Sequence, residues 1–175
     1  MTEDEEFPER AADAFADHEA FEPADAGGFA VTTTRFGGRV AAADTDDWAI
    51  EYALTVRAPT LESATTDEVG DAVAAGWFET FERRLEDAPQ STRADVDLAE
   101  LDVAEDGPEV VATLTVAYGN ADRAPEVLKA MAEYVEGTYV EGIVPGYEYT
   151  GAVADLLDDA RSGGGDGGAS GSMPL

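Results

Sequence analysis

The chain has 175 residues and a formal net charge of −29, from 39 acidic and 10 basic residues. This length suits one domain, and the charge argues against partners recognised through their phosphates, such as nucleic acid and anionic membranes. The absence of cysteine excludes disulfides, thiolate metal sites and cysteine nucleophiles. No apolar run reaches the roughly 18 residues of a spanning helix, and the N-terminus lacks signal-peptide features, so we expect a cytoplasmic protein.

The composition is biased as well as acidic. Nine of the ten basic residues are Arg, and Val, Leu, Ile and Phe make up about a fifth of the chain, which at this charge raises the question of disorder. Molar salt would screen the repulsion between acidic groups and allow a light core to suffice. In this bias the chain resembles the cytosolic proteins of halophilic archaea. Over residues 7–161 it is also similar to uncharacterised small proteins of those organisms, a resemblance that implies no activity and no catalytic residue. An acidic mimic of nucleic acid and a partner-binding protein of ordinary salinity remain alternatives.

The N-terminal half predicts one helix and three strands. Apolar residues at spacings of three and four indicate a helix over 8–19, and β-branched and aromatic residues indicate a strand over 29–36. A weaker strand follows over 39–43. The clearest strand covers 48–57, where large apolar residues from Trp48 onward alternate with small or polar ones, which predicts one buried face.

The C-terminal half continues with a long central helix that starts at Thr65 or Thr66 and ends before Pro89. Strands are predicted over 92–98 and 109–118, with a slip in the apolar pattern between Leu98 and Leu101 that indicates a bulge or an early strand end. The remaining predicted elements are a turn at Asp106-Gly107, a helix with Pro125 in its first turn and Gly137 at its end, and a short helix over 152–161.

The order is helix, three strands, helix, two strands, helix, helix. It favours an α+β fold with an antiparallel sheet of about five strands and helices packed on one face. We expect a single domain over 1–161 that includes an acidic leader at 1–6, and a disordered Gly/Ser-rich tail at 162–175. The order also resembles the small α+β domain of type III secretion chaperones, as a likeness of fold without shared motifs.

The sheet face opposite the helices is predicted to be small and poor in charge, although the protein charges its surface heavily elsewhere. Such a face is either an ordinary exposed surface or a contact with a second copy or another protein. The candidate interface residues are Thr32, Thr34, Thr55, Thr113 and Thr115.

Motifs for chemistry are missing. The chain has neither a phosphate loop nor a dinucleotide fingerprint, and its one histidine, His18, is interpreted as a residue at a helix end. The carboxylates of Asp44, Asp46 and Asp47 crowd one turn without the spacing of a calcium loop, so a solvated turn is favoured over weak cation binding. We therefore expect no metal site and no cofactor.

Two functions follow as hypotheses. The missing catalytic groups favour a non-enzymatic protein-interaction module whose partner is a second copy of the chain or another protein. The alternative is a small-molecule or anion-binding protein or enzyme, in which Arg35 and Arg39 flank a turn and hold an anion while Tyr147 and Tyr149 present aromatic rings.

Overall fold

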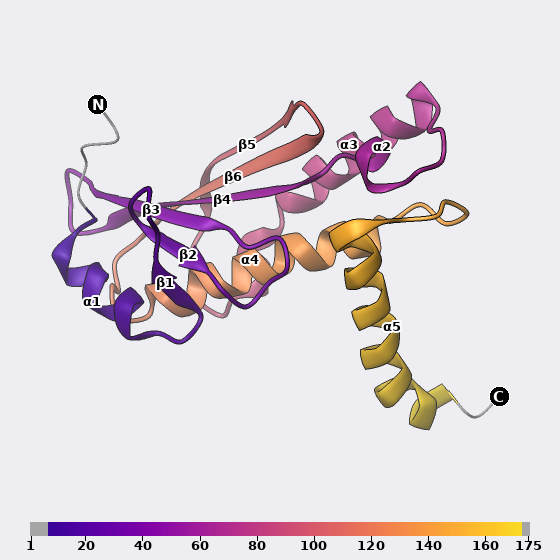
Figure 1. Cartoon of the computed structure of the whole chain (residues 1–175). Helices are drawn as coiled ribbons and strands as arrows, with labels where there is room; N and C mark the ends of the chain where they lie inside the picture. Colours follow the sequence, from indigo (N-terminus) through magenta and orange to yellow (C-terminus); the bar gives the residue numbers. More distant parts are fainter. Residues whose placement is uncertain (1–6, 173–175) are drawn as a thin grey trace.

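A computed structural model describes the backbone of residues 7–172 and the side chains of residues 7–162. The elements in chain order are α1 (Glu9–Asp17), β1 (Phe21–Pro23), β2 (Phe29–Val31), β3 (Arg39–Asp44), β4 (Ile50–Pro59), α2 (Leu61–Ala64), α3 (Asp71–Leu85), η2 (Ala88–Ser91), β5 (Leu98–Asp106), β6 (Glu109–Tyr118), α4 (Ala124–Glu141) and α5 (Gly151–Ser172). The predicted α+β class is confirmed (Figure 1).

One antiparallel sheet holds six strands in the order β1-β2-β3-β4-β6-β5, one strand more than the sequence predicts. The additional strand is β1, which pairs with β2 inside a stretch predicted to be a connection. Glycines make the turn between them possible, since Gly27 and Gly28 both have positive φ. A Cβ on Gly28 would lie 2.2 Å from the carbonyl oxygen of Val40, so this turn lies directly against β3.

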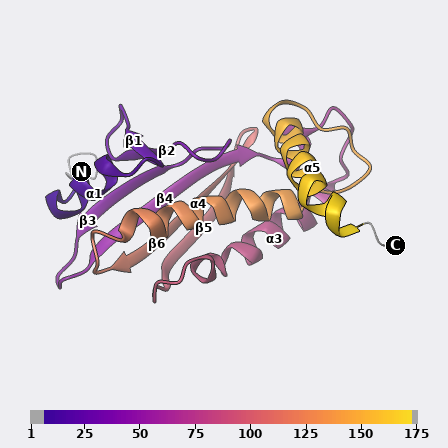
Figure 2. The same cartoon turned by 90° about the horizontal axis from the view of Figure 1, so that it is seen from below.

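Helices cover one face of the sheet. Seen from below, α4 lies across the strands with α3 beside it (Figure 2). The alternation along the two central strands matches this arrangement: Leu54 and Leu114 face each other and are fully buried, whereas their neighbours Thr55 and Thr113 point the other way and are half-buried. The predicted packing of helices on one face is confirmed.

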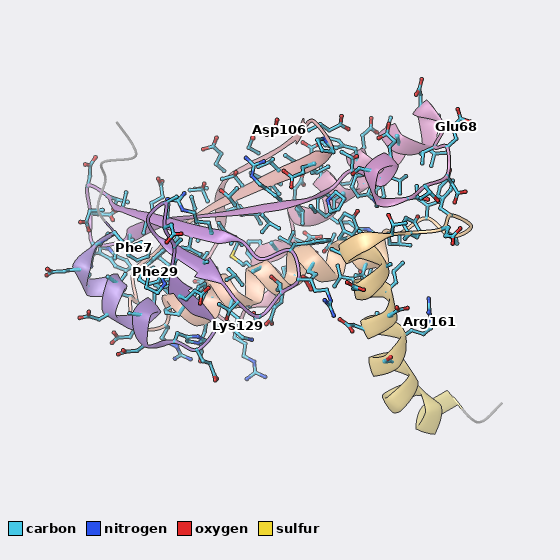
Figure 3. The ribbon with its side chains drawn as sticks, viewed as in Figure 1. Phe7, Phe29, Glu68, Asp106, Lys129 and Arg161 are labelled. Carbon is cyan, nitrogen blue, oxygen red and sulfur yellow. The ribbon has the colours of Figure 1, made fainter. Side chains whose placement is uncertain are left out.

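Aromatic side chains form two clusters between the helices and the sheet. Near α1, the rings of Phe7 and Phe29 lie 5.0 Å apart (Figure 3). At the other end of the layer, Tyr139 of α4 packs edge-on against Trp77 and Phe81 of α3. These large rings fill the space that a core rich in alanine leaves open.

The first strand of the β5–β6 hairpin, β5, lies later in the chain than the sequence predicts. Residues 92–97 connect η2 to the sheet, and β5 begins at Leu98 instead of ending there. Val96 is buried outside any strand, so an apolar residue at alternating spacing does not by itself mark a strand. The predicted irregularity is confirmed, because the register of β5 against β6 shifts between Leu98 and Glu100.

Trp48 is the largest error in the predicted core, since it is 71% exposed. The strand starts two residues later, at Ile50, because the turn before it redirects the chain. The ring of Trp48 lies instead over Gly119, where a Cβ would be 1.3 Å from the ring. The indole is therefore supported by backbone at the end of β6 and open to solvent on its other side.

The helix boundaries also differ from the predicted ones. The predicted central helix corresponds to α3, which starts at Asp71 after Gly70 instead of at Thr65 or Thr66. The short helix α2 before it was not predicted; Thr60 caps it by accepting the Ser63 N–H. Helix α4 passes through the predicted stop at Gly137 and ends at Glu141, with Gly142 as its C-cap, since a single glycine weakens a helix without ending it.

The C-terminal helix is longer than predicted, because the backbone of α5 is helical from Gly151 to Ser172. Most of the predicted disordered tail therefore falls on helical backbone. The rest of it, residues 173–175, lies outside the described residues, as does the predicted acidic leader at 1–6.

Candidate functional site

The sheet face that no helix covers carries a central patch of small uncharged side chains. All six are half-buried, and they come from the three adjacent strands β3, β4 and β6: Ala41, Ala53, Thr55, Val111, Thr113 and Thr115. The hydroxyl oxygens of Thr55 and Thr113 lie 3.4 Å apart across the two strands. Three of the five predicted interface residues are therefore neighbours on this patch.

The other two predicted interface residues lie elsewhere. Thr32 and Thr34 follow β2 in a loop, because β2 is only three residues long. The Thr32 hydroxyl donates to the carbonyl of Glu19, and the Thr34 hydroxyl donates to the carbonyl of Gly37. Both hydroxyls hold local backbone and are not part of the open face.

Charged residues border the central patch. The row that contains Thr55 and Thr113 has Asp102 of the edge strand β5 at one end and includes Arg39 of β3. Beyond β3 it continues through Ala30 of β2 to Glu22 of β1. Glu100 of β5 ends the next row, and Arg57 of β4 ion-pairs with Asp106 and Glu109 beside the hairpin turn. The border thus carries both signs of charge, in a protein with a large net negative charge.

Arg35, in the loop after β2, contacts the helices α4 and α5. Its guanidinium lies 2.7 Å from Asp159 and 3.9 Å from Asp155, both in α5. The hydrogen bond and charge of Asp159 raise the pKa of Arg35. The Glu136 carboxylate on α4 accepts the backbone N–H groups of Arg35 and Phe36 at 2.7 and 3.1 Å. The predicted ligand-binding arginine is thus engaged in contacts of the fold.

The other three predicted ligand-binding residues contact different partners. The Arg39 guanidinium donates to the carbonyls of Ala26 and Gly27 in the β1–β2 turn. The Tyr147 and Tyr149 rings lie 6.4 Å apart, and the Tyr149 hydroxyl donates to the Val144 carbonyl. Among the hydrogen bonds and ion pairs of residues 7–162, none joins either arginine to either tyrosine. Ligand binding by this set of four stays a prediction.

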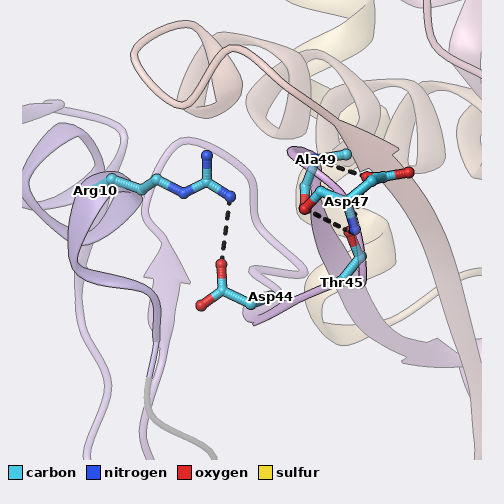
Figure 4. Close-up of polar contacts among 5 residues, drawn as sticks. All are labelled: Arg10, Asp44, Thr45, Asp47 and Ala49. Carbon is cyan, nitrogen blue, oxygen red and sulfur yellow. Dashed lines mark hydrogen bonds and ion pairs between the residues drawn. The ribbon is translucent and has the colours of Figure 1, made fainter.

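Two carboxylates of the aspartate-rich turn before β4, those of Asp44 and Asp47, form contacts with other groups of the chain (Figure 4). Asp44 pairs with Arg10 at 3.3 Å. Asp47 accepts the Ala49 N–H at 3.0 Å and the Thr45 hydroxyl at 3.1 Å, and these two hydrogen bonds lower the pKa of Asp47. Within the described part of the chain, no three side chains of His, Asp or Glu gather as metal ligands would.

A cavity of about 480 Å³, which the sequence patterns did not predict, opens where β6 ends beside the start of α4. Its lining includes Arg93 from the segment after η2 and Arg123 at the N-terminal end of α4. Tyr118 at the end of β6 also lines it. The two arginines are 30 residues apart in sequence, so only the scarcity of basic residues could have drawn attention to them.

His18 has the structural role expected for it. It is the C-cap residue of α1, and its Nδ1 accepts the backbone N–H of Ala20 at 3.1 Å. The hydrogen bond turns the chain from α1 into β1, which begins at Phe21.

Comparisons with known proteins place the chain in a family without assigning it an activity. No helix in the described residues is both long and apolar enough to cross a membrane. No curated protein and no solved structure matches the chain. The model of one family matches residues 16–159, which include every strand from β1 to β6, the helices from α2 to α4 and the beginning of α5. The chain therefore belongs to the family of unknown function DUF5813.

Proposed function

We propose that this protein is a non-enzymatic interaction module of a salt-rich cytosol, and that its partner is a second copy of the chain, bound through the open sheet face. The observation that carries the proposal is the row Arg39, Thr55, Thr113 and Asp102, which crosses β3, β4, β6 and β5 in that order. Within this row, positive charge stands at Arg39 on β3 and negative charge at Asp102 on the edge strand β5, with two threonines between them on β4 and β6.

This row is complementary to itself. A two-fold axis parallel to the strands, between β4 and β6, lays β3 of one copy over β5 of the other. Arg39 then faces the second copy's Asp102, and Thr55 faces its Thr113, so each charge pair occurs twice. Aligned packing of two sheets face to face is a common arrangement in proteins.

The central patch suits such a contact because its side chains are small. Alanine loses no rotamer freedom when it is covered, and threonine and valine lose little, so burial costs little conformational entropy. A charged patch would instead carry a desolvation penalty of several kcal/mol for each ion. The patch therefore supports a contact in which charge is confined to the border.

The contact is expected to be weak and dependent on salt. Four strands about 4.8 Å apart and about six residues of 3.3 Å each give a face of roughly 400 Å² per copy. Twice this area, about 800 Å², is below the roughly 1,200 Å² of stable specific interfaces, so the contact would be weak and transient. Two copies of charge −29 repel each other strongly at low ionic strength, and molar salt reduces the Debye length to about 3 Å. We therefore expect dimers at high salt and high protein concentration.

The test is light scattering coupled to size-exclusion chromatography, over a protein dilution series and from about 0.1 to 3 M KCl. Asp102→Arg should weaken the dimer roughly tenfold, because two border pairs become repulsive. Its control, Asp95→Arg, makes the same charge change at an exposed residue outside the sheet. The double variant Arg39→Glu with Asp102→Arg restores the pair with its signs exchanged and should recover the dimer.

The charge change itself makes this test decisive. Asp102→Arg lowers the net negative charge, so general repulsion between copies decreases and would favour association. Weaker association together with recovery in the double variant therefore reports the specific pairing. A monomer at every salt concentration, or a dimer that Asp102→Arg and Asp95→Arg affect alike, would overturn the proposal.

A further inference from the structure

We propose that the cavity at the start of α4 binds a small organic oxyanion, whose phosphate or carboxylate group is held by Arg93 and Arg123. This site is separate from the open face, because it lies among the segment after η2, the end of β6 and α4, on the side of the sheet that the helices cover. It is also a different place from the arginine and tyrosine residues that the sequence singled out.

The two arginines stand out because acidic partners are abundant in this chain. Five basic residues form ion pairs: Arg10, Arg35, Arg57, Lys129 and Arg161. Arg39 donates to two backbone carbonyls. The remaining four arginines have no ion pair with any residue between 7 and 162: Arg83, Arg84, Arg93 and Arg123. Of these four, Arg93 and Arg123 line the cavity and the other two do not. Two guanidinium groups in one concavity present paired donors that match the geometry of a carboxylate or phosphate.

The remaining lining supplies hydrogen bonds and apolar contact. The Thr92 hydroxyl oxygen accepts the Ala94 N–H at 3.2 Å, which leaves its proton available to a ligand. Tyr118, Val127 and Ala130 also line the cavity, and we take them as its apolar wall. A cavity of about 480 Å³ falls within the range of small-molecule sites. The ligand class is therefore an oxyanion attached to an aromatic or aliphatic body.

The start of helix α4 and the carboxylate of Glu126 narrow the class of ligand further. The cavity adjoins the first turn of an 18-residue helix, whose positive end favours an anion. Glu126, the one carboxylate in the lining, leaves the three charged groups with a net charge of about +1. Because Glu126 repels a second anionic group and accepts hydrogen bonds, it favours a ligand that carries a single oxyanion beside a hydroxyl or ammonium group.

Salt affects this site in two opposing ways. The charge of −29 repels anions at long range, and molar KCl screens that repulsion. Chloride at the same concentration competes for the guanidinium groups. An oxyanion that accepts two parallel N–H bonds holds an advantage over a spherical ion at such a site. Binding should therefore be measured at high KCl, where long-range repulsion no longer hides the local attraction.

The experiment is a titration of ¹⁵N-labelled full-length protein in about 2 M KCl with phenyl phosphate, benzoate and inorganic phosphate, followed by NMR. The backbone signals of residues 91–94 and 118–127 should shift with phenyl phosphate or benzoate, and the tighter of the two identifies the preferred oxyanion. Inorganic phosphate should bind more weakly than phenyl phosphate, because it leaves the apolar wall uncovered.

Variants assign the binding to the two guanidinium groups. Arg93→Gln and Arg123→Gln should each weaken binding by roughly tenfold or more, as expected for the loss of a charge-assisted hydrogen bond. Arg83→Gln is the matched control, because Arg83 is exposed on α3 and lies outside the cavity lining. Unchanged spectra of the free variants outside the site show that they remain folded.

Three results would overturn the proposal. One is the absence of shifts with both aromatic probes at millimolar concentration. A second is that the shifts map to residues outside the cavity. The third is equal weakening by Arg83→Gln, which would show that the probes respond to general charge. The oligomer test above uses different residues, so either proposal can fail while the other stands.

Discussion

Tyr52 and Tyr139 form a matched pair for testing how polar groups contribute to this core. Both side chains are fully buried. The Tyr139 hydroxyl donates to the Pro59 carbonyl at 2.9 Å, whereas the Tyr52 hydroxyl has no hydrogen-bond partner among the described residues. Replacing either tyrosine by phenylalanine removes one oxygen atom and leaves the ring packing in place. The same chemical change should therefore have opposite effects on stability.

The magnitudes follow from the two environments. Tyr139→Phe loses a net hydrogen bond of about 0.5–1.5 kcal/mol. Tyr52→Phe removes a buried polar group whose desolvation nothing compensates, so it should stabilise the fold by about 1–3 kcal/mol. For a domain of this size, 1 kcal/mol corresponds to roughly 2–4 °C in Tm. The two variants should differ by at least about 1.5 kcal/mol.

The assay is urea unfolding of the wild type and each variant at a single KCl concentration in the molar range, followed by circular dichroism. Equal dependence of the unfolding free energy on urea concentration would show that all three proteins expose a similar surface area when they unfold. Destabilisation by Tyr52→Phe of 1 kcal/mol or more would refute the reasoning, since it would show that the hydroxyl is satisfied in solution, for example by a buried water molecule.

Three further predictions follow from contacts described above. Burial raises the pKa of both tyrosine hydroxyls, that of Tyr52 to about 12. The stability that comes from keeping these hydroxyls neutral is therefore present below pH 10 and should be lost as the pH rises from 10 to 12 and beyond. The midpoint of urea unfolding should fall over that range, and Tyr52→Phe should reduce the fall. Gly119→Ala should displace the Trp48 ring and shift its fluorescence to the red, at a cost of about 1–2 kcal/mol in lost burial; an unchanged spectrum would contradict the contact. Glu136→Ala, which removes the acceptor, should release the loop after β2 from α4, seen as faster amide exchange at Arg35; exchange equal to that of the wild type would argue against the contact.

Sequence patterns predicted the elements whose signal is long and regular. Strands β4 and β6 each alternate over ten residues, and Pro125 in the first turn of α4 marks the start of that helix. Errors arose where a local contact overrides the pattern. The hydrogen bond from Ala49 to Asp47 turns the chain, so Trp48 leaves the strand it was assigned to. Strand β1 is three residues long, too short for periodicity to show.

The candidate site was predictable in part for the same reason. Thr55, Thr113 and Thr115 lie on long strands whose alternation fixes the face of each residue. Which residues stand opposite each other across four strands depends on register, so the position of Arg39 in line with Asp102 could not be predicted. The cavity depends on two segments that are distant in sequence and have irregular backbone, and no periodic signal describes them.

The two edge strands, β1 and β5, determine where a strand of another copy could add to this sheet. β1 is three residues long and ends in Pro23, which has no N–H to offer to an incoming strand. At the opposite edge, β5 presents a row of exposed acidic side chains, so approaching copies repel each other there. The proline works at any ionic strength, whereas the acidic row protects less as salt rises. Extension of the sheet into fibrils by strand addition should therefore begin at β5, and concentrated salt is the condition that exposes this risk.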